Sequence, residues 1–138
     1  MNLPRSLGNL KDCSMTELLW GLFAFLPANH CSNVEQLSDF LCQLQEQVPE
    51  FRTRFGERRS DLRVGIDRIR SFALMGGILQ EEIELGPPQL RPRYSSVPSV
   101  KRELEERNVL PKHSQAFQLF ADCYQTFIRV NRASRTTA

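Results

Sequence analysis

Proline and glycine residues divide this chain into segments, and each long segment has the periodicity of a helix. Pro27, Pro49, the Gly76–Gly77 pair and Pro111 stand at the ends of these periodic runs. Proline cannot continue a helix, because it lacks the backbone N–H and its ring clashes with the preceding turn. Glycine commonly ends a helix in a left-handed cap. The breaks therefore predict a mainly α-helical chain with several separate helices.

Two capping boxes predict where the first two helices begin. The motifs are SMTE at 14–17 and SNVE at 32–35, in which the serine hydroxyl accepts a hydrogen bond from the backbone three residues later. The first predicts a helix from 15 to about 26 that is apolar on nearly every side, and so is central or covers a partner. The second predicts a helix from 33 to about 47, ending before Pro49. Three glutamines of this helix are expected to face solvent: Gln43, Gln45 and Gln47.

A third helix and a β-hairpin are predicted to follow one another. The helix begins at Ser60 or Asp61, ends at about Met75 and is terminated by the glycine pair. Residues 78–85 favour a strand, GPPQ at 86–89 is a turn, and 90–96 is a second extended segment. The apolar stripe of the helix is expected to comprise Leu62, Ile66, Ile69, Phe72 and Ala73.

Two more helices are predicted in the C-terminal part. The fourth begins at Ser96 or Ser99 and is broken by Pro111, and the fifth runs from Ser114 to about Val130. At 138 residues the chain has the length of one domain with a substantial core. We expect four parts: an N-terminal arm (1–13), a main domain (14–96), C-terminal helices for dimerisation or partner binding (97–130), and a flexible tail (131–138).

The positive charge is concentrated in one region. The net charge is only +2, yet residues 51–75 hold seven arginines against three acidic residues. Arginine outnumbers lysine by fifteen to three, and its planar guanidinium grips phosphates and guanine edges with two hydrogen bonds. The cluster indicates a face directed at an anionic partner. The alternative is that a GC-rich genome raises the arginine content and that these side chains are simply solvated.

The segment GIDRIRSFALMGGILQEE at 65–82, followed by a proline-rich tip and LRPRYSS at 90–96, resembles the recognition helix and wing of a winged helix-turn-helix domain. In that superfamily such a helix often ends in glycine, and the second wing strand often ends in an aromatic residue such as Tyr94. The resemblance covers roughly residues 14–96, and PadR-like regulators are the nearest comparison. It implies a winged-helix-like three-helix core with a small β-hairpin wing and additional C-terminal helices.

The resemblance also implies that the chain binds duplex DNA, as a dimeric transcriptional regulator. In this docking mode the start of the recognition helix meets base edges, while flanking residues touch phosphates. The sequence pI of about 8.5 is nevertheless low for a nucleic-acid-binding domain. The expected base-reading residues are Arg59 and Arg63, with Arg68 and Arg70 further along. The expected phosphate contacts are Arg52, Arg54 and Arg58 before the helix and Arg91 and Arg93 on the wing.

A protein–protein interaction module is the alternative function. A winged helix also serves as an adaptor or a small subunit without binding DNA, because fold does not fix function. The first and fifth helices offer more apolar surface than one small core needs, which favours a homodimer or a protein partner. The other possibility is that these two helices pack on each other inside the monomer. The expected partner interface comprises Phe117, Phe120, Tyr124, Phe127 and Ile128.

The sequence gives little support for an enzyme, a metal site or a cofactor. No cysteine pair has the two-residue spacing of a zinc or redox motif, and no glycine-rich phosphate loop is present. Free cysteines among apolar residues favour the reducing cytoplasm. The sequence contains no apolar run long enough to cross a bilayer and no secretory leader, so we expect a cytoplasmic protein without a membrane contact. The metal- and base-type residues considered are Cys13, Cys31, Cys42, Cys123, His30 and His113.

Overall fold

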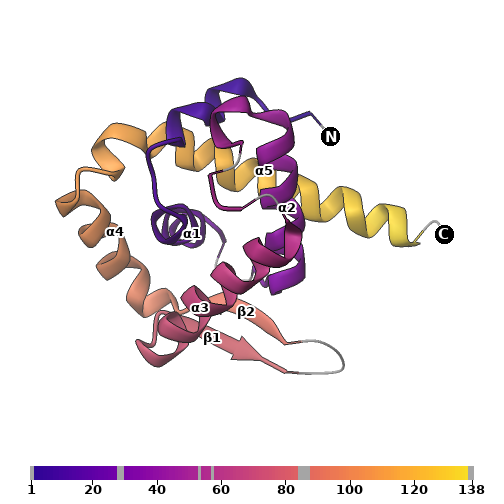
Figure 1. Cartoon of the computed structure of the whole chain (residues 1–138). Coiled ribbons are helices and arrows are strands. Elements are labelled where there is room, and N and C mark those ends of the chain that lie inside the picture. Colours follow the sequence, from indigo (N-terminus) through magenta and orange to yellow (C-terminus); the bar gives the residue numbers. More distant parts are fainter. Residues whose placement is uncertain (1, 28–29, 53, 57, 84–87, 137–138) are drawn as a thin grey trace.

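The first helix occupies the centre of the molecule. The computed structural model describes residues 2–27, 30–52, 54–56, 58–83 and 88–136, with side chains as far as residue 131. Helix α1 (Met15–Ala24) is surrounded by the other helices, as Figure 1 shows along its axis. The Ser14 hydroxyl accepts from the Glu17 N–H, and the Glu17 carboxylate accepts from the Ser14 N–H, both at 3.1 Å. The predicted capping box and the central position of this helix are confirmed.

The second helix begins with a different cap from the one predicted. In α2 (Val34–Gln47), the Asn33 side chain accepts from the Gln36 N–H at 2.8 Å, and the Gln36 side chain accepts from the Asn33 N–H at 3.0 Å. The prediction that Ser32 caps this helix is wrong, because Ser32 is fully buried and its hydroxyl lies 2.7 Å from the His30 Nε2 atom. The sequence holds two overlapping boxes, and asparagine is as good a cap as serine.

Gln45 holds the link that follows α2 in place. The link contains a short 3-10 helix, η2 (Pro49–Phe51), whose Phe51 ring is fully buried. The Gln45 side chain is buried, and its amide donates to the Gly56 carbonyl at 3.0 Å and accepts from the Phe55 N–H at 3.4 Å. The prediction that Gln45 faces solvent is therefore wrong, because its amide supplies hydrogen bonds that the backbone of the link needs.

The third helix and its glycine terminator are confirmed. Helix α3 (Arg59–Met75) packs beside α2, and Gly77 adopts a left-handed conformation with φ of +71°. The Gly77 N–H donates to the Leu74 carbonyl at 3.2 Å, and the Ile78 N–H donates to the Ala73 carbonyl at 2.9 Å. These two bonds satisfy carbonyls at the end of the helix and turn the chain into the hairpin.

The predicted β-hairpin is present beside α3. Strands β1 (Leu79–Glu82) and β2 (Gln89–Pro92) are antiparallel, with Leu79 opposite Pro92. The first half of the predicted GPPQ turn, residues 86–87, lies outside the described residues. Ser32 adds a single antiparallel bridge to Leu90 on β2, with its N–H donating at 2.8 Å. The α1–α2 connection is thereby fixed to the hairpin.

The last two helices differ from their predicted bounds. Helix α4 (Val97–Glu106) follows a short 3-10 helix, η3 (Tyr94–Ser96), and α5 runs from Leu110 to Thr136. Pro111 lies in the first turn of α5, where its missing N–H costs no hydrogen bond, so α5 begins four residues earlier than predicted. The helix also continues into the segment that was expected to fray.

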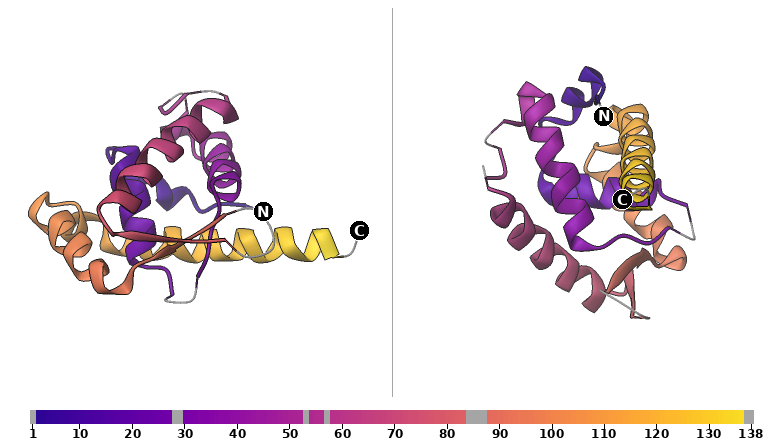
Figure 2. Two further views of the ribbon diagram at one scale, coloured as in Figure 1. Left: turned by 90° about the horizontal axis from the view of Figure 1, so that it is seen from below. Right: turned by 90° about the vertical axis from the view of Figure 1, so that its right-hand side faces the viewer.

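One hydrophobic core joins the parts that the sequence suggested were separate. The N-terminal 3-10 helix η1 (Arg5–Leu10) packs against α5, and α5 also packs against α1 and α4. Figure 2 shows η1 beside the upper part of α5 in its right-hand view. The side chains of Leu3, Leu7 and Leu10 are buried in the same cluster as the aromatic residues of α5. The predicted N-terminal arm (1–13) therefore contributes Leu3, Leu7, Leu10 and Cys13 to the core of the molecule.

Candidate binding surface

Two arginines at the start of α3 are paired with acidic residues of α2. The Arg59 guanidinium binds the Asp39 carboxylate at 2.5 Å and also binds Glu35, and the Arg63 Nε atom lies 3.1 Å from Glu35. The Arg59 hydrogen bond holds the pKa of the Glu35 carboxyl below its usual value. These were the two residues expected to read base edges, and both instead lie along the contact between α2 and α3.

Two further arginines of the predicted DNA-binding set are paired with the hairpin. Arg70 binds the Glu81 carboxylate on β1, and Arg91 on β2 binds Glu82 at 2.8 Å. Ion pairs at partly exposed positions such as these contribute little to stability, about 0–1 kcal/mol. Their effect on the surface is larger, because each one places a negative charge beside an arginine that was expected to contact DNA.

The remaining five arginines fall into two groups. Arg54 donates to the Cys13 carbonyl at 2.8 Å and lies over the Phe55 ring at 5.4 Å, so it supports the link between α2 and α3. Arg52 is exposed on the same link. The other three are exposed and form no ion pair within the described part of the chain. They are Arg58, Arg68 and Arg93.

The side of α3 that faces away from the core carries three exposed apolar side chains. Val64, Phe72 and Met75 are 53%, 72% and 83% exposed, and their spacing places them with Arg68 on one side of the helix. Leu62, Ile66 and Ala73 occupy the buried side instead and are at most 1% exposed. The prediction that Phe72 belongs to the core stripe is wrong, because Ala73 at the next position takes that place. We call Val64, Arg68, Phe72 and Met75 the α3 stripe.

The aromatic side chains of α5 are buried inside the chain. The Phe40 ring of α2 lies 5.3 Å from Phe120, 5.1 Å from Tyr124 and 5.4 Å from Phe127, measured between ring centroids. Burial raises the pKa of the Tyr124 hydroxyl. Packing of α5 against α1 and α2 explains why this helix is so apolar, and it leaves no aromatic surface there for a partner. The five predicted interface residues are each at most 6% exposed: Phe117, Phe120, Tyr124, Phe127 and Ile128.

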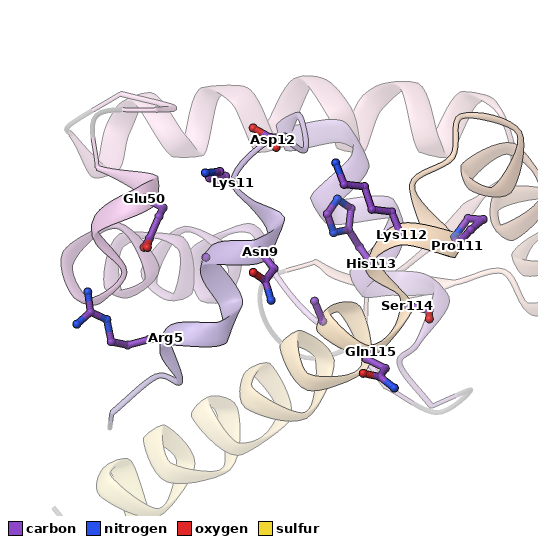
Figure 3. Close-up of a pocket in the computed structure, with 12 residues that line it drawn as sticks. Arg5, Asn9, Lys11, Asp12, Glu50, Pro111, Lys112, His113, Ser114 and Gln115 are labelled. Atoms are coloured by element: carbon purple, nitrogen blue, oxygen red, sulfur yellow. The ribbon is translucent and has the colours of Figure 1, made fainter.

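A polar cavity of about 670 Å³ lies between η1 and the first turns of α5. Figure 3 shows Arg5, Asn9 and Lys11 on the η1 side, and Lys112 and His113 on the α5 side. Asp12 and Glu50 also line it, so basic and acidic groups are mixed and no single ligand charge is favoured. The cavity gives no indication of a particular chemistry.

His113 makes folding sensitive to acid. Its side chain is buried, and desolvation followed by the nearby Lys112 charge holds its pKa below 6.5, against the opposing effects of Asp12 and Glu17. The unfolded chain therefore binds a proton more readily than the folded one, and stability falls as pH drops from about 6.5 through the folded pKa.

We expect His113→Gln to reduce this pH-dependent fall in the free energy of unfolding, measured by urea titrations between pH 8 and 5. If the free energy of unfolding falls equally with pH in the variant and in the unaltered protein, this role of His113 is contradicted.

One serine and one histidine lie in the geometry of a nucleophile and its base. The His30 Nε2 atom is 2.7 Å from the Ser32 hydroxyl, and the His30 ring lies 5.6 Å from the Tyr124 ring. Ser32 is fully buried and is also bridged to β2, so its hydroxyl cannot reach a substrate. The pair is best explained as a satisfied polar group that joins the α1–α2 connection to the core.

Cysteine and metal chemistry give no alternative site. All four cysteines are free thiols, and burial raises the pKa of the Cys13 thiol to about 11. Among the described residues, no group of three or more histidine, cysteine or acidic side chains is placed to hold a metal ion. In that same part of the chain, no helix combines the length and apolarity needed to cross a membrane.

Comparison with known proteins identifies no relative of the chain. No protein-family model matches the chain, and no curated protein and no solved structure matches it either.

Sequence reasoning missed the apolar side of α3. It assigned Phe72 to the core, although Ile69 and Ala73 already continue that stripe. A helical wheel contains the missing signal, because Val64, Phe72 and Met75 fall together on the side opposite the paired arginines.

Proposed function

We propose that this chain is a winged-helix protein–protein interaction module, acting as an adaptor or a small subunit of a larger assembly. The winged-helix interpretation is supported by the order of α1, α2 and α3, followed by a glycine cap and a hairpin that packs beside α3. Two features differ from the usual DNA-binding form: α2 has 14 residues, and the link at 48–58 is longer than a tight turn.

The exposed α3 stripe carries this proposal. A helix that reads DNA presents polar side chains to base edges and phosphates, whereas this one presents valine, phenylalanine and methionine to solvent. Phenylalanine and methionine are enriched in protein interfaces. The solvent-facing apolar side of α3 is therefore better suited to a protein surface than to a DNA groove.

The paired arginines also favour a protein partner. Glu35 and Asp39 lie beside Arg59, and Glu81 lies beside Arg70. Although surface ion pairs are weak and a phosphate could compete for the arginine, the released carboxylate would remain close to the phosphate and repel it.

DNA binding is the second candidate, because Arg58, Arg68 and Arg93 are exposed and free of ion pairs within the described residues. A regulator would use them as phosphate contacts, in a dimer whose interface lies outside the buried aromatic residues of α5. Three such contacts would give a measurable salt dependence of the affinity.

Anisotropy of a labelled random-sequence duplex, measured at several salt concentrations, separates the two candidates. We expect the affinity to be no tighter than about 10⁻⁴ M near physiological salt, the weak end of non-specific binding. We also expect the Arg59→Ala/Arg63→Ala variant to match the unaltered protein. Micromolar binding that falls steeply with salt would overturn the proposal and support the DNA-binding function, through Arg59 and Arg63 if it is lost in this variant and through Arg58, Arg68 and Arg93 if it is retained.

A further inference from the structure

The α3 stripe has the dimensions of a helix-binding surface. Val64 and Met75 are eleven positions apart, which corresponds to about 16 Å along the helix axis, or three turns. The buried side of the helix is held by Leu62 and Ile66, and Gly65 lies close to the Met15 thioether of α1. Figure 2 places α3 at the edge of the molecule, where another helix can lie alongside it.

Unpaired positive charge accompanies the stripe. Arg68 lies in its middle, between Val64 and Phe72, and makes no ion pair within the described residues. Arg93 is exposed, and its guanidinium lies near Gly77, just after the C-terminal end of α3. A Cβ atom added to Gly77 would be 3.6 Å from the Arg93 Nη1 atom. Four negative side chains of α2 and the hairpin are instead bound to other arginines: Glu35 and Asp39 to Arg59 and Arg63, Glu81 to Arg70, and Glu82 to Arg91.

One acidic residue belongs to this side of the helix. Asp61 precedes Val64 by one turn, and its side chain lies against Gly56 at the N-terminal end. Arg58, directly before α3, offsets its charge. The centre and the C-terminal part of the stripe therefore retain a positive charge beside exposed apolar side chains.

We infer that the α3 stripe binds an acidic amphipathic helix of a partner protein, an inference that rests on the proposed interaction function. The apolar side of the partner helix packs on Val64, Phe72 and Met75, in the spacing that adjacent helices use for side-chain packing. Its flanking glutamates or aspartates bind Arg68 and Arg93. Complementary charge sets the orientation of the partner helix and excludes basic helices.

A second copy of the chain suits this face less well. A two-fold axis through the middle of the stripe would bring Arg68 of one copy close to Arg68 of the other. Opposed guanidinium groups would repel each other without a carboxylate between them. An acidic helix supplies that carboxylate, and a basic or neutral one does not.

The test uses the purified full chain and a labelled synthetic peptide of about five turns, with leucines at helical i, i+4, i+7 and i+11 positions and glutamates on the flanks. A scrambled peptide of the same composition and a version with lysine in place of every glutamate are the matched peptide controls. Phe72→Ala and Arg68→Glu are the test variants. Arg102→Glu, at an exposed position on α4, controls for a general change in charge.

We expect the glutamate peptide to bind and the scrambled peptide not to bind. Phe72→Ala and Arg68→Glu should each weaken binding roughly tenfold or more, as truncation of an interface hot spot does, while Arg102→Glu should not. The lysine peptide should bind Arg68→Glu better than it binds the unaltered protein. Equal binding of the glutamate and scrambled peptides, or equal losses for Arg68→Glu and Arg102→Glu, would overturn the inference.

Four further outcomes identify a different occupant. Sedimentation that shows a dimer lost on Phe72→Ala, or binding of the lysine peptide to the unaltered protein, would overturn the acidic-helix inference but leave a protein-binding function. Phe72-dependent binding to vesicles containing one-third phosphatidylserine would replace the helix by a membrane surface. Duplex DNA binding that requires Arg59 and Arg63 would overturn both the inference and the proposed function.

Discussion

Replacing Phe40 with alanine is expected to lower the free energy of unfolding by about 3–5 kcal/mol. Phe40 is fully buried, and its ring packs against Phe120, Tyr124 and Phe127 of α5. Removing it leaves a cavity and also deletes the favourable edge and offset contacts between the rings. Urea unfolding followed by circular dichroism measures the change.

Phe72→Ala is the matched control, because it makes the same chemical change at a position that is 72% exposed. We expect its free energy of unfolding to stay within about 0.5 kcal/mol of the unaltered protein. Similar losses at the two positions would mean that Phe72 packs inside the molecule, and would remove the basis for the α3 stripe.

Replacing Gly21 with alanine is the second large effect we expect, and it reverses the usual preference. Alanine in a helix interior is normally about 1 kcal/mol better than glycine. A Cβ atom at Gly21, however, would lie within 3.0 Å of three atoms of the Phe117 ring, which is itself fully buried. Because neither helix can move without disturbing the core, the substitution should lower the free energy of unfolding by about 1–3 kcal/mol or more.

Gly65→Ala in α3 is the control for this effect. The atoms nearest to its added Cβ would be the Sδ atom of Met15 at 2.9 Å and its Cε atom at 3.3 Å, the flexible end of a side chain that can move aside. Thermal unfolding should therefore show no loss, or a small gain. In addition, Gly21→Ala should lower the free energy of unfolding by less in a Phe117→Leu background. An equal loss in both backgrounds would show that the Phe117 ring does not obstruct the added Cβ atom.

Local signals predicted the helices well, because the features that start and stop them are local. The Ser14 cap, the glycine terminator and the hairpin after it depend on a few neighbouring residues, and all three are present. Ser32 and Gln45 could not be placed in the same way. Which of two overlapping capping boxes is used depends on a bridge to Leu90, and Gln45 is buried because the link that follows α2 folds back over it.

The candidate site was less predictable, because it depends on how two helices are rotated against each other. The sequence shows an arginine cluster, yet whether Arg59 meets a phosphate or Asp39 is decided by the packing of α3 on α2. The same rotation turns Phe72 outward. Composition shows how many arginines this region holds, whereas the tertiary contacts determine which of them are paired.

Contact between η1 and α5 has a consequence for how the protein is made in the cell. Leu3, Leu7 and Leu10 are synthesised well before α5, the helix that they pack against. Until then the nascent chain displays these leucines and the apolar surface of α1 to solvent, which is the kind of surface that aggregates or recruits chaperones. Folding of this core should therefore wait until α5 has been synthesised.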